Sequence, residues 1–197
     1  MKKVLVVGAT GVVGQAVADT LAEGHEVVRS SRTDGERADI SDPSSVRALF
    51  ERIGPVDAVV CCAGAVPFKP LPELTTDDYR AGLEDKVLGQ VNLVTEGLRH
   101  VRDGGSFTFI TGVLAREPIA TGVAASMANG ALESFVTAAA TELPRGLRIN
   151  AVSPSVLVEA ESYHPFFPGF PQVPAEDVAR AYVRSVDGVE TGKVFRV

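Results

Sequence analysis

The sequence predicts an α/β protein with a doubly wound parallel sheet, arranged as a three-layer α/β/α sandwich. Short apolar runs alternate with amphipathic stretches along the chain, and the runs are continuous, as in strands buried on both faces. Right-handed crossovers between such strands place helices on both sides of the sheet. The 197 residues fit a single domain over 1–197, without linker or internal repeat.

The expected strands are rich in β-branched residues, which suit a pleated, buried surface. The first, KKVLVVGA, breaks at Gly8 and is too short for the apolar core of a signal peptide. RADI, the third, is a short candidate. In chain order the expected strands are residues 2–9, 25–31, 37–40, 56–64, 105–112, 147–154 and 192–197.

The expected helices are delimited by capping residues, prolines and glycines. Ser41 or Asp42 caps the second helix, and Pro43 takes its first position. The third has cap candidates at 75–78 and keeps a helical period over a long stretch. In chain order the expected helices are residues 11–24, 41–54, 75–101, 125–146 and 175–186.

The composition argues against several classes of function. The chain has 19 Lys and Arg residues and 25 Asp and Glu residues, which gives a formal net charge of -6. This negative charge disfavours nucleic acid or an anionic membrane as a binding partner. No apolar stretch approaches the ~18–20 residues that span a bilayer. Cys61 and Cys62 are adjacent, which suits neither a structural disulfide nor a metal site. We therefore expect no metal and a cytoplasmic location.

A glycine-rich turn follows the first strand, with Gly8, Gly11 and Gly14 in G-x-x-G-x-x-G spacing. Glycine lets the backbone turn tightly and approach a pyrophosphate, and the next helix supplies free N–H groups and a positive dipole end. The alternative is a turn that serves packing alone. The strand–turn–helix context favours dinucleotide binding and a Rossmann-like fold. The expected contacts from this turn are Gly8, Thr10, Gly11, Val12 and Val13.

The end of the second strand indicates which dinucleotide binds. An acidic residue there would hold the ribose 2′-hydroxyl of NAD, but the sequence has Ser31 and Arg32, which suit a 2′-phosphate. We predict NADP(H), with an exposed surface arginine as the alternative. Arg29 is closer to the strand body and is a weaker candidate. Asp39 and Ile40 would contact the adenine, although Asp39 could equally cap the next helix.

Over nearly its full length the chain resembles the short-chain dehydrogenase/reductase family. The motifs follow the family's order: the glycine turn at 8–14, DI at 39–40, CCAG at 61–64 where the family has Asn-Asn-Ala-Gly, RINAVSP at 148–154 and a terminal TGKVFRV. The resemblance implies a small-molecule substrate and a homodimer or homotetramer. It also implies cofactor contacts by Cys62, Ala63, Gly64 and Pro154.

The family's chemistry uses a tyrosine as acid/base and, four residues on, a lysine that holds the nicotinamide ribose. ASMANGALESFVTAAATEL resembles the helix that carries them, with its S-K-x-A-L pattern, and we expect the tyrosine position at Val123 and the lysine position at Met127. Neither side chain can do this chemistry, so the resemblance implies a remodelled active site. The family's serine position falls near Thr111 and its asparagine position at Lys86.

We predict Lys86, Thr111 and Tyr163 as candidate catalytic residues. Lys86 lies in mid-helix, one turn from Gln90, on the face expected to meet the cofactor cleft, where its ammonium would also contact the cofactor. A solvated surface lysine is the alternative for Lys86, and a β-branched strand residue is the alternative for Thr111.

Tyr163 belongs to the proline-rich segment 155–174, which we interpret as a lid over the site. Its phenylalanines would exclude water or line a substrate pocket, although a loop that packs its own aromatics is the alternative. Two more candidates for this cleft are His164 and Glu117, whereas His25 and His100 are expected at the surface. The phenylalanines are Phe166, Phe167 and Phe170.

These observations favour an NADP(H)-dependent oxidoreductase of a small carbonyl or alcohol, with a remodelled active site. The alternative is a non-catalytic, NADP(H)-responsive binding or regulatory protein, which the missing tyrosine and lysine would suit. A third possibility is a structural subunit whose fourth long helix packs against its own copy, although the same stripe would also pack on the sheet. That stripe is Ala131, Leu132, Phe135, Val136, Ala139 and Leu143.

Overall fold

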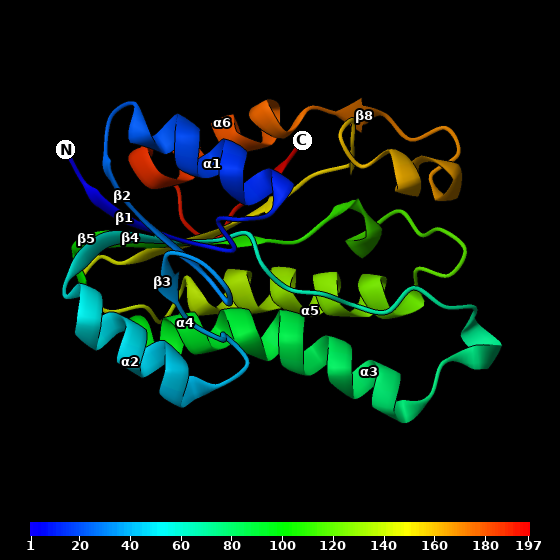
Figure 1. Ribbon diagram of the computed structural model, residues 1–197, viewed down its shortest axis with the longest axis horizontal. Coiled ribbons are helices and arrows are strands. Elements are labelled where there is room, and N and C mark those ends of the chain that lie inside the picture. Colours follow the sequence, from blue (N-terminus) through cyan, green and yellow to red (C-terminus); the bar gives the residue numbers. More distant parts are fainter.

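The computed structural model describes residues 1–197 and contains one seven-stranded parallel sheet, with helices on both faces (Figure 1). Its strands are β1 (Lys3–Val7), β2 (Glu26–Ser31), β3 (Glu36–Arg37), β4 (Val56–Cys61), β5 (Val101–Ile110), β6 (Arg148–Ser153) and β9 (Val194–Arg196). Their order across the sheet is β3-β2-β1-β4-β5-β6-β9, so the chain winds outward from β1 in both directions. The predicted doubly wound α/β sandwich is confirmed.

Helices of two groups cover the sheet. The helices are α1 (Val12–Ala22), α2 (Pro43–Ile53), α3 (Thr76–Gly82), α4 (Gly89–Gly97), α5 (Val123–Ala139) and α6 (Ala175–Asp187), with a π-helical turn, η2 (Leu83–Leu88), between α3 and α4. In Figure 1, α1 and α6 lie on one side of the sheet, and α2, α4 and α5 lie on the other.

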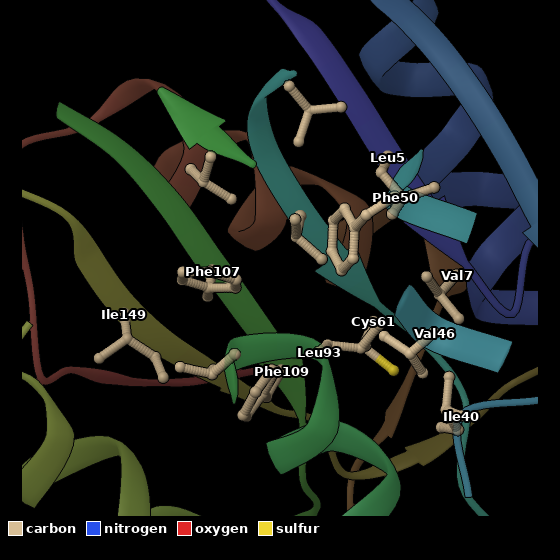
Figure 2. Close-up of a cluster of buried hydrophobic side chains, with 14 of the residues drawn as sticks. Leu5, Val7, Ile40, Val46, Phe50, Cys61, Leu93, Phe107, Phe109 and Ile149 are labelled. Atoms are coloured by element: carbon tan, nitrogen blue, oxygen red, sulfur yellow. The ribbon is translucent and has the colours of Figure 1, made fainter. Parts of the chain in front are cut away.

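The strands separate two hydrophobic cores. Along β1, Leu5 and Val7 face the core under α2, α4 and α5, while Val4 and Val6 face the core under α1 and α6. This alternation is the period of two that a strand buried on both faces requires. Figure 2 shows the first core, where aromatic side chains of β5 and α2 meet.

The predicted caps and turns explain where several helices begin. The side chain of Asp42 accepts a hydrogen bond from the backbone N–H of Ser44 and caps α2, with Pro43 at its first position. Thr75 and Asp78 form a capping box at the start of α3. From there α3, η2 and α4 continue as one helical run to Gly97, somewhat shorter than the 75–101 expected.

Three boundaries differ from the sequence expectation. The third strand comprises Glu36–Arg37 rather than 37–40, and β5 begins at Val101, four residues before the expected strand. The α5 helix begins at Val123 and ends at Ala139, well before Pro144. Irregular turns follow it, and the non-glycine residue Arg145 adopts a positive φ of 58° there.

The segment 155–174 contains regular secondary structure that the sequence did not predict. Its ends form a two-stranded parallel ladder, β7 (Val156–Leu157) with β8 (Gln172–Val173), and a 3₁₀ helix, η4 (Glu161–Phe166), lies between them. The ladder brings the base of the segment together, and Figure 1 shows the rest extending from the sheet at the carboxyl ends of its strands.

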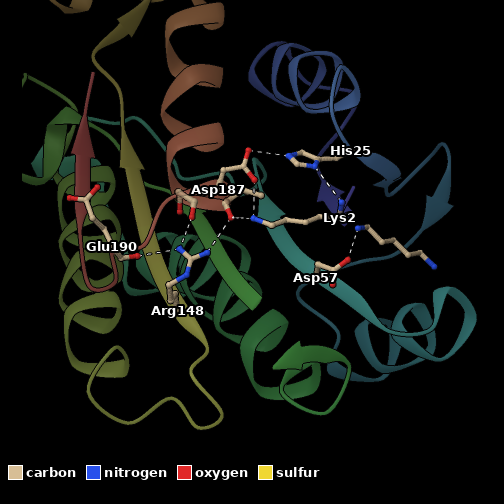
Figure 3. Close-up of polar contacts among 9 residues, drawn as sticks. Lys2, His25, Asp57, Arg148, Asp187 and Glu190 are labelled. Atoms are coloured by element: carbon tan, nitrogen blue, oxygen red, sulfur yellow. Dashed lines mark hydrogen bonds and ion pairs between the residues drawn. The ribbon is translucent and has the colours of Figure 1, made fainter. Parts of the chain in front are cut away.

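Charged and polar contacts close the opposite end of the sheet, where the strands begin (Figure 3). Asp187 pairs with Lys2 at 2.8 Å and with His25 at 3.1 Å. Arg148 donates to backbone carbonyls at the end of α6. The expected surface residue His25 therefore contacts Asp187 with only 13% of its side chain exposed, and His100 stacks on the core ring of Phe50.

Candidate functional site

The glycine turn brings the backbone of β1 very close to its neighbours. Gly8 has a φ of +81°, and a Cβ there would lie 2.9 Å from the backbone of Ala63. A Cβ on Gly14 would lie 2.0 Å from the carbonyl oxygen of Gly8. Only glycine fits at these two positions, because one needs an unusual φ and the other has no room for a methyl group.

The amino end of α1 is left without a capping side chain. Gly11 is its N-cap residue and offers no side-chain acceptor, and the first turn has no acidic residue. By contrast, side chains cap α2 and α3. The free N–H groups of an uncapped helix start form a site suited to an anion such as a phosphate.

The turn opens into a cleft of about 370 Å³, which we call the glycine-turn cleft. Ten of the predicted cofactor contacts line it, namely Gly8, Thr10, Gly11, Ser31, Arg32, Asp39, Ile40, Cys62, Ala63 and Gly64. Five lining residues were not predicted, namely Val7, Thr33, Ala38, Ala65 and Asp85. Val12 and Val13 are not part of the lining, and they belong to the first turn of α1.

The rim of this cleft at the end of β2 contains one free arginine. Arg32 is exposed and makes no ion pair, whereas Arg29 pairs with Asp19 of α1 at 2.6 Å. Ser31 is buried, and its hydroxyl is bonded within the turn that follows, to the backbone of Asp34. The guanidinium of Arg32 is thus available to a ligand, while the Ser31 side chain mainly shapes the turn.

Asp39 and Ile40 border the cleft on the side of β3. Oδ1 of Asp39 accepts hydrogen bonds from the backbone N–H and the hydroxyl of Ser41, while Asp42 provides the cap of α2. The helix-capping alternative for Asp39 is therefore wrong, because the carboxylate is used in a short local turn. Ile40 packs against α4, where a Cβ on Gly89 would lie 2.8 Å from it.

Beyond Gly64 and Ala65 the groove continues into a second space of about 360 Å³, the Lys86 cavity. These two residues line both spaces, so the glycine-turn cleft and the Lys86 cavity adjoin at the loop after β4. All three predicted catalytic residues border the Lys86 cavity, as does Pro154. The complete lining is Gly64, Ala65, Val66, Phe68, Lys86, Thr111, Gly112, Val113, Leu114, Ala125, Asn129, Pro154, Ser155, Val156, Tyr163 and Phe167.

Lys86 is buried at the wall of this cavity and is not a surface residue. It lies in the π-helical turn η2, a type of helical irregularity often found at functional sites, and is 8% exposed. The structure gives its ammonium no salt bridge. Burial lowers the pKa of Lys86 to about 8, against weaker opposing effects of Cys61 and Asp85.

The neighbouring side chain of Gln90 connects this helical run to the end of β5. Its amide nitrogen donates to the carbonyl of Ile110, and its amide oxygen accepts from the N–H of the same residue, both at 3.0 Å. Gln90 thereby bonds to β5 as a neighbouring strand would, at a point where β4 has already ended. This fixes Lys86 and Thr111 relative to each other from two different elements.

Thr111 follows β5, is 4% exposed and has its hydroxyl engaged inside the protein. Oγ1 donates to Oε1 of Glu133 at 3.2 Å, with the carbonyl of Val152 at 3.3 Å as a second acceptor. Arg116 holds the same Glu133 oxygen at 2.6 Å and also contacts Ser153. Because the Thr111 hydroxyl already donates its hydrogen to these acceptors, its oxygen acts as a hydrogen-bond acceptor toward the cavity.

The structure corrects the alignment of α5. Val123 is 38% exposed and Met127 is 40% exposed, and neither borders the cavity. Ala125 and Asn129, two residues further on, are buried and line it. A shift of two residues rotates a position by about 200° around an α-helix, so the expected pair faces away from the site.

The sequence contains a signal for this correct register. Matching the last two letters of the S-K-x-A-L pattern to Ala131 and Leu132 places the lysine position at Asn129 and the tyrosine position at Ala125. Neither of these residues can act as an acid or a base at neutral pH. Arg116 and Glu133 were also missed, and no local pattern marks them because they meet only through the packing of α5 on the sheet.

The segment 155–174 covers one side of the Lys86 cavity. Tyr163, 46% exposed, packs edge-on against Phe68 with ring centroids 5.8 Å apart. Phe167 also lines the cavity, while Phe166 and Phe170 border a separate apolar hollow next to Pro118.

Two further candidates do not reach the Lys86 cavity. His164 contacts the carbonyl of Leu157 through Nε2 at 2.8 Å, within its own segment. Glu117 is exposed and lies outside the lining. Of the two cysteines, Cys61 is buried in the core and Cys62 is half-buried at the cleft, and burial raises the pKa of both thiols. Both are free and poorly reactive.

Comparisons with known proteins identify relatives that are described as reductases or oxidoreductases. A protein-family profile described as Enoyl-(Acyl carrier protein) reductase matches residues 6–194. An uncharacterized oxidoreductase of Methylorubrum extorquens is 30% identical over 182 residues, covering 80% of this chain and 73% of that protein. A versicolorin reductase of Emericella nidulans is 28% identical, covering 76% of this chain and 60% of its own length.

Solved structures agree with the fold. The crystal structure of a Listeria innocua protein has a TM-score of 0.98 and 43% identity, with 100% of both chains covered. A small-chain dehydrogenase in complex with NADPH has a TM-score of 0.88 and 28% identity, covering 99% of this chain and 95% of that one. No helix of this protein has the length and apolar character needed to cross a membrane.

Proposed function

Because this chain belongs to the short-chain dehydrogenase/reductase family, we propose that it is an NADP(H)-dependent oxidoreductase of a small carbonyl or alcohol. The observation that carries the proposal is that the glycine-turn cleft and the Lys86 cavity adjoin, because Gly64 and Ala65 line both. A dinucleotide needs such an extended site, with a phosphate-binding turn at one end and a place for chemistry at the other.

The residues of the glycine-turn cleft fit a dinucleotide. Glycine at positions 8 and 14 lets the turn pack closely against the loop after β4 and against the start of α1. The uncapped start of α1 suits a phosphate group. Free Arg32 at the end of β2, together with the absence of an acidic residue at that strand end, favours the 2′-phosphate of NADP(H) over the hydroxyl of NAD.

When bound, the cofactor supplies or accepts the hydride. The protein then needs a proton donor near the reacting oxygen, and Lys86 is the cation that lines the cavity. Its pKa of about 8 is close to neutral pH, as a general acid requires. Thr111 accepts a hydrogen bond from a substrate hydroxyl, because its own proton is bonded to Glu133 or Val152. Tyr163 covers the substrate and excludes water.

The assembly and the location of the protein are further proposals. In the stripe of α5, Leu132 and Val136 are fully buried on the sheet, so they serve the core of the monomer rather than a subunit interface. Exposed apolar residues nearby, Leu88 of η2 with Val123 and Met127, are candidates for a homo-oligomeric contact. A reducing cytoplasmic compartment is proposed from the two unpaired thiols.

A second candidate function is an NADP(H)-responsive binding protein without turnover. The observation that favours it is that none of the three tyrosines is followed four residues later by a lysine. In this case Lys86 would contribute affinity for the cofactor instead of a proton for the reaction. The two functions share the groove and differ in what happens at the Lys86 cavity.

The test is a titration of the protein with NADPH and NADH, followed through nucleotide fluorescence, with no Trp in the chain to interfere. A panel of small aldehydes and ketones is then screened for NADPH oxidation. Binding with turnover supports the oxidoreductase, and binding without turnover across a broad panel supports the responsive protein. If neither nucleotide binds, both functions are wrong.

A further inference from the structure

Lys86 differs from every other lysine of the chain in its surroundings. Lys2 and Lys69 pair with carboxylates at 2.8 and 2.5 Å. Lys3 donates to a backbone carbonyl at 2.6 Å, and Lys193 is exposed to solvent. Lys86 is 8% exposed and forms no salt bridge, and it lines a cavity of about 360 Å³. A buried amine without a counter-ion is the state in which lysine acts as a nucleophile in proteins.

Burial makes part of this amine available in its neutral form. Because burial disfavours the charged ammonium, it lowers the pKa of Lys86 to about 8. At pH 7 about a tenth of the side chain is then neutral, against fewer than about one in a thousand for a lysine in water. Cys61 and Asp85 oppose this effect only in part. The neutral amine has the lone pair that is needed to attack an electrophilic carbon.

The cavity provides space and apolar surface next to this amine. A Cβ on Gly64 would lie 2.8 Å from Cγ of Lys86, so the glycine leaves room for the lysine side chain. Apolar side chains form a large part of the lining, among them Val66, Phe68 and Leu114. Such walls suit the hydrocarbon part of a small ligand and limit the access of water, which hydrolyses an imine.

Two oxygen atoms of the cavity are hydrogen-bond acceptors that have no donor in the protein. Oδ1 of Asn129 is buried without a partner. The hydroxyl of Thr111 donates its hydrogen to Glu133 or Val152, which leaves its oxygen as an acceptor. An aldehyde offers these atoms only another acceptor. The carbinolamine and the protonated imine that an amine forms with an aldehyde offer O–H and N–H donors, so the lining favours the adduct over the aldehyde.

We propose that Lys86 binds small apolar aldehydes covalently as an imine, in a reversible reaction that needs no cofactor. The neutral amine attacks the carbonyl carbon, a C–N bond forms, and a proton moves from nitrogen to oxygen to give a carbinolamine. Its hydroxyl takes up a proton and leaves as water, and a protonated imine remains, without any oxidant or reductant. The inference goes beyond the proposed hydride transfer, in which the ammonium form of the same side chain protonates the carbonyl oxygen.

The first experiment treats the protein with butanal and sodium cyanoborohydride at pH 7, without nucleotide. The reagent reduces each imine to a stable amine, and mass spectrometry of the peptides gives the initial rate of labelling at every lysine. We expect Lys86 to react about tenfold faster than exposed Lys193, because a larger share of it is neutral. Equal rates, or no label on Lys86 while Lys193 reacts, would overturn the inference.

The second experiment removes the unpartnered acceptor. Asn129→Leu keeps the approximate size of the side chain, and we expect about fivefold slower labelling of Lys86 relative to Lys193, as the loss of one hydrogen bond to the adduct implies. The matched control is Met127→Leu on the outward face of α5, which should leave this ratio unchanged. An unchanged ratio in Asn129→Leu would contradict the assignment of its amide to the adduct.

Failure of this inference is distinguishable from failure of the proposed function. Labelling of Lys86 is measured without nucleotide, whereas the oxidoreductase is tested by binding and oxidation of NADPH. A protein that oxidises NADPH but labels Lys86 no faster than Lys193 would refute the imine alone. A protein that labels Lys86 selectively but binds no nucleotide would refute the oxidoreductase alone.

Discussion

The two ends of the groove are built in different ways. The glycine-turn cleft depends on backbone: a positive φ at Gly8, a close approach at Gly14 and the free N–H groups of α1. The Lys86 cavity depends on side chains that come from η2, β5, α5 and the segment 155–174. The glycine turn of the first is encoded within one short stretch of chain, whereas the Lys86 cavity is lined only by residues from separate elements that pack together.

The two ends also differ in whether their polar side chains already have hydrogen-bond partners within the protein. In the glycine-turn cleft the side chains of Ser31 and Asp39 are hydrogen-bonded to nearby backbone groups. In the Lys86 cavity, Oδ1 of Asn129 has no hydrogen-bond partner, and burial disfavours the charged form of Lys86. We infer that substitutions at the turn damage the fold and binding together, and that substitutions in the cavity reduce function while the free protein keeps its stability.

The largest effect is expected from Gly14→Ala. The new methyl group would lie 2.0 Å from the carbonyl oxygen of Gly8, so the turn must shift. We expect a loss of about 3 kcal/mol in the free energy of unfolding and no measurable NADPH binding, checked by urea unfolding and fluorescence titration. The matched control is Gly130→Ala, at an open helical position, which should gain about 0.5–1 kcal/mol. Similar stability in both variants would contradict the backbone-built turn.

Lys86→Met should separate function from stability most clearly. Loss of a general acid lowers turnover by about 100-fold or more, measured as NADPH oxidation with a carbonyl substrate. At pH 7 the free energy of unfolding should rise by about 2 kcal/mol, because burial of a charge is avoided. Lys193→Met, on the remote β9 side, is the control. A variant with full turnover would remove Lys86 from the reaction.

Arg32→Ala tests the cofactor preference at the other end. A charge-assisted contact to the 2′-phosphate is worth about 1.5–3 kcal/mol, so NADPH should bind more than tenfold more weakly while NADH is unaffected. The control is Arg29→Ala, since Arg29 is paired with Asp19 and faces α1. An equal loss of affinity for both nucleotides would show that Arg32 does not read the phosphate.

The smallest predicted effect is the dependence of NADPH affinity on pH. Burial lowers the pKa of Lys86 to about 8 in the free protein, so the ammonium is present below that pH and is lost above it. Affinity that uses the ammonium is therefore complete at pH 7 and should fall up to about tenfold by pH 9. The measurement is a titration at each pH, and Lys86→Met should show a flat profile between these values. A flat profile in the unmodified protein would argue that the bound cofactor does not contact the ammonium.

Much of this protein could be predicted from local sequence. The alternation of strands and helices, the glycine turn, the caps at Asp42 and Thr75 and the candidate arginine at position 32 follow from patterns within about a dozen residues. The long helix that carries Lys86 was also predicted, although the π-helical turn within it was not. That turn gives no clear local signal, because its residues are ordinary helix formers.

The sequence by itself determined which elements form, the class of fold they build and where a phosphate-binding turn must lie. These properties depend on neighbouring residues, through hydrophobic period, capping and the allowed values of φ. The tertiary structure decided between the two ways of matching α5 to the S-K-x-A-L pattern, since a helical period fixes the spacing of a face but not its direction. Packing on the sheet turned Asn129 inward and Met127 outward, and it placed Glu133 where its carboxylate accepts a hydrogen bond from the Thr111 hydroxyl.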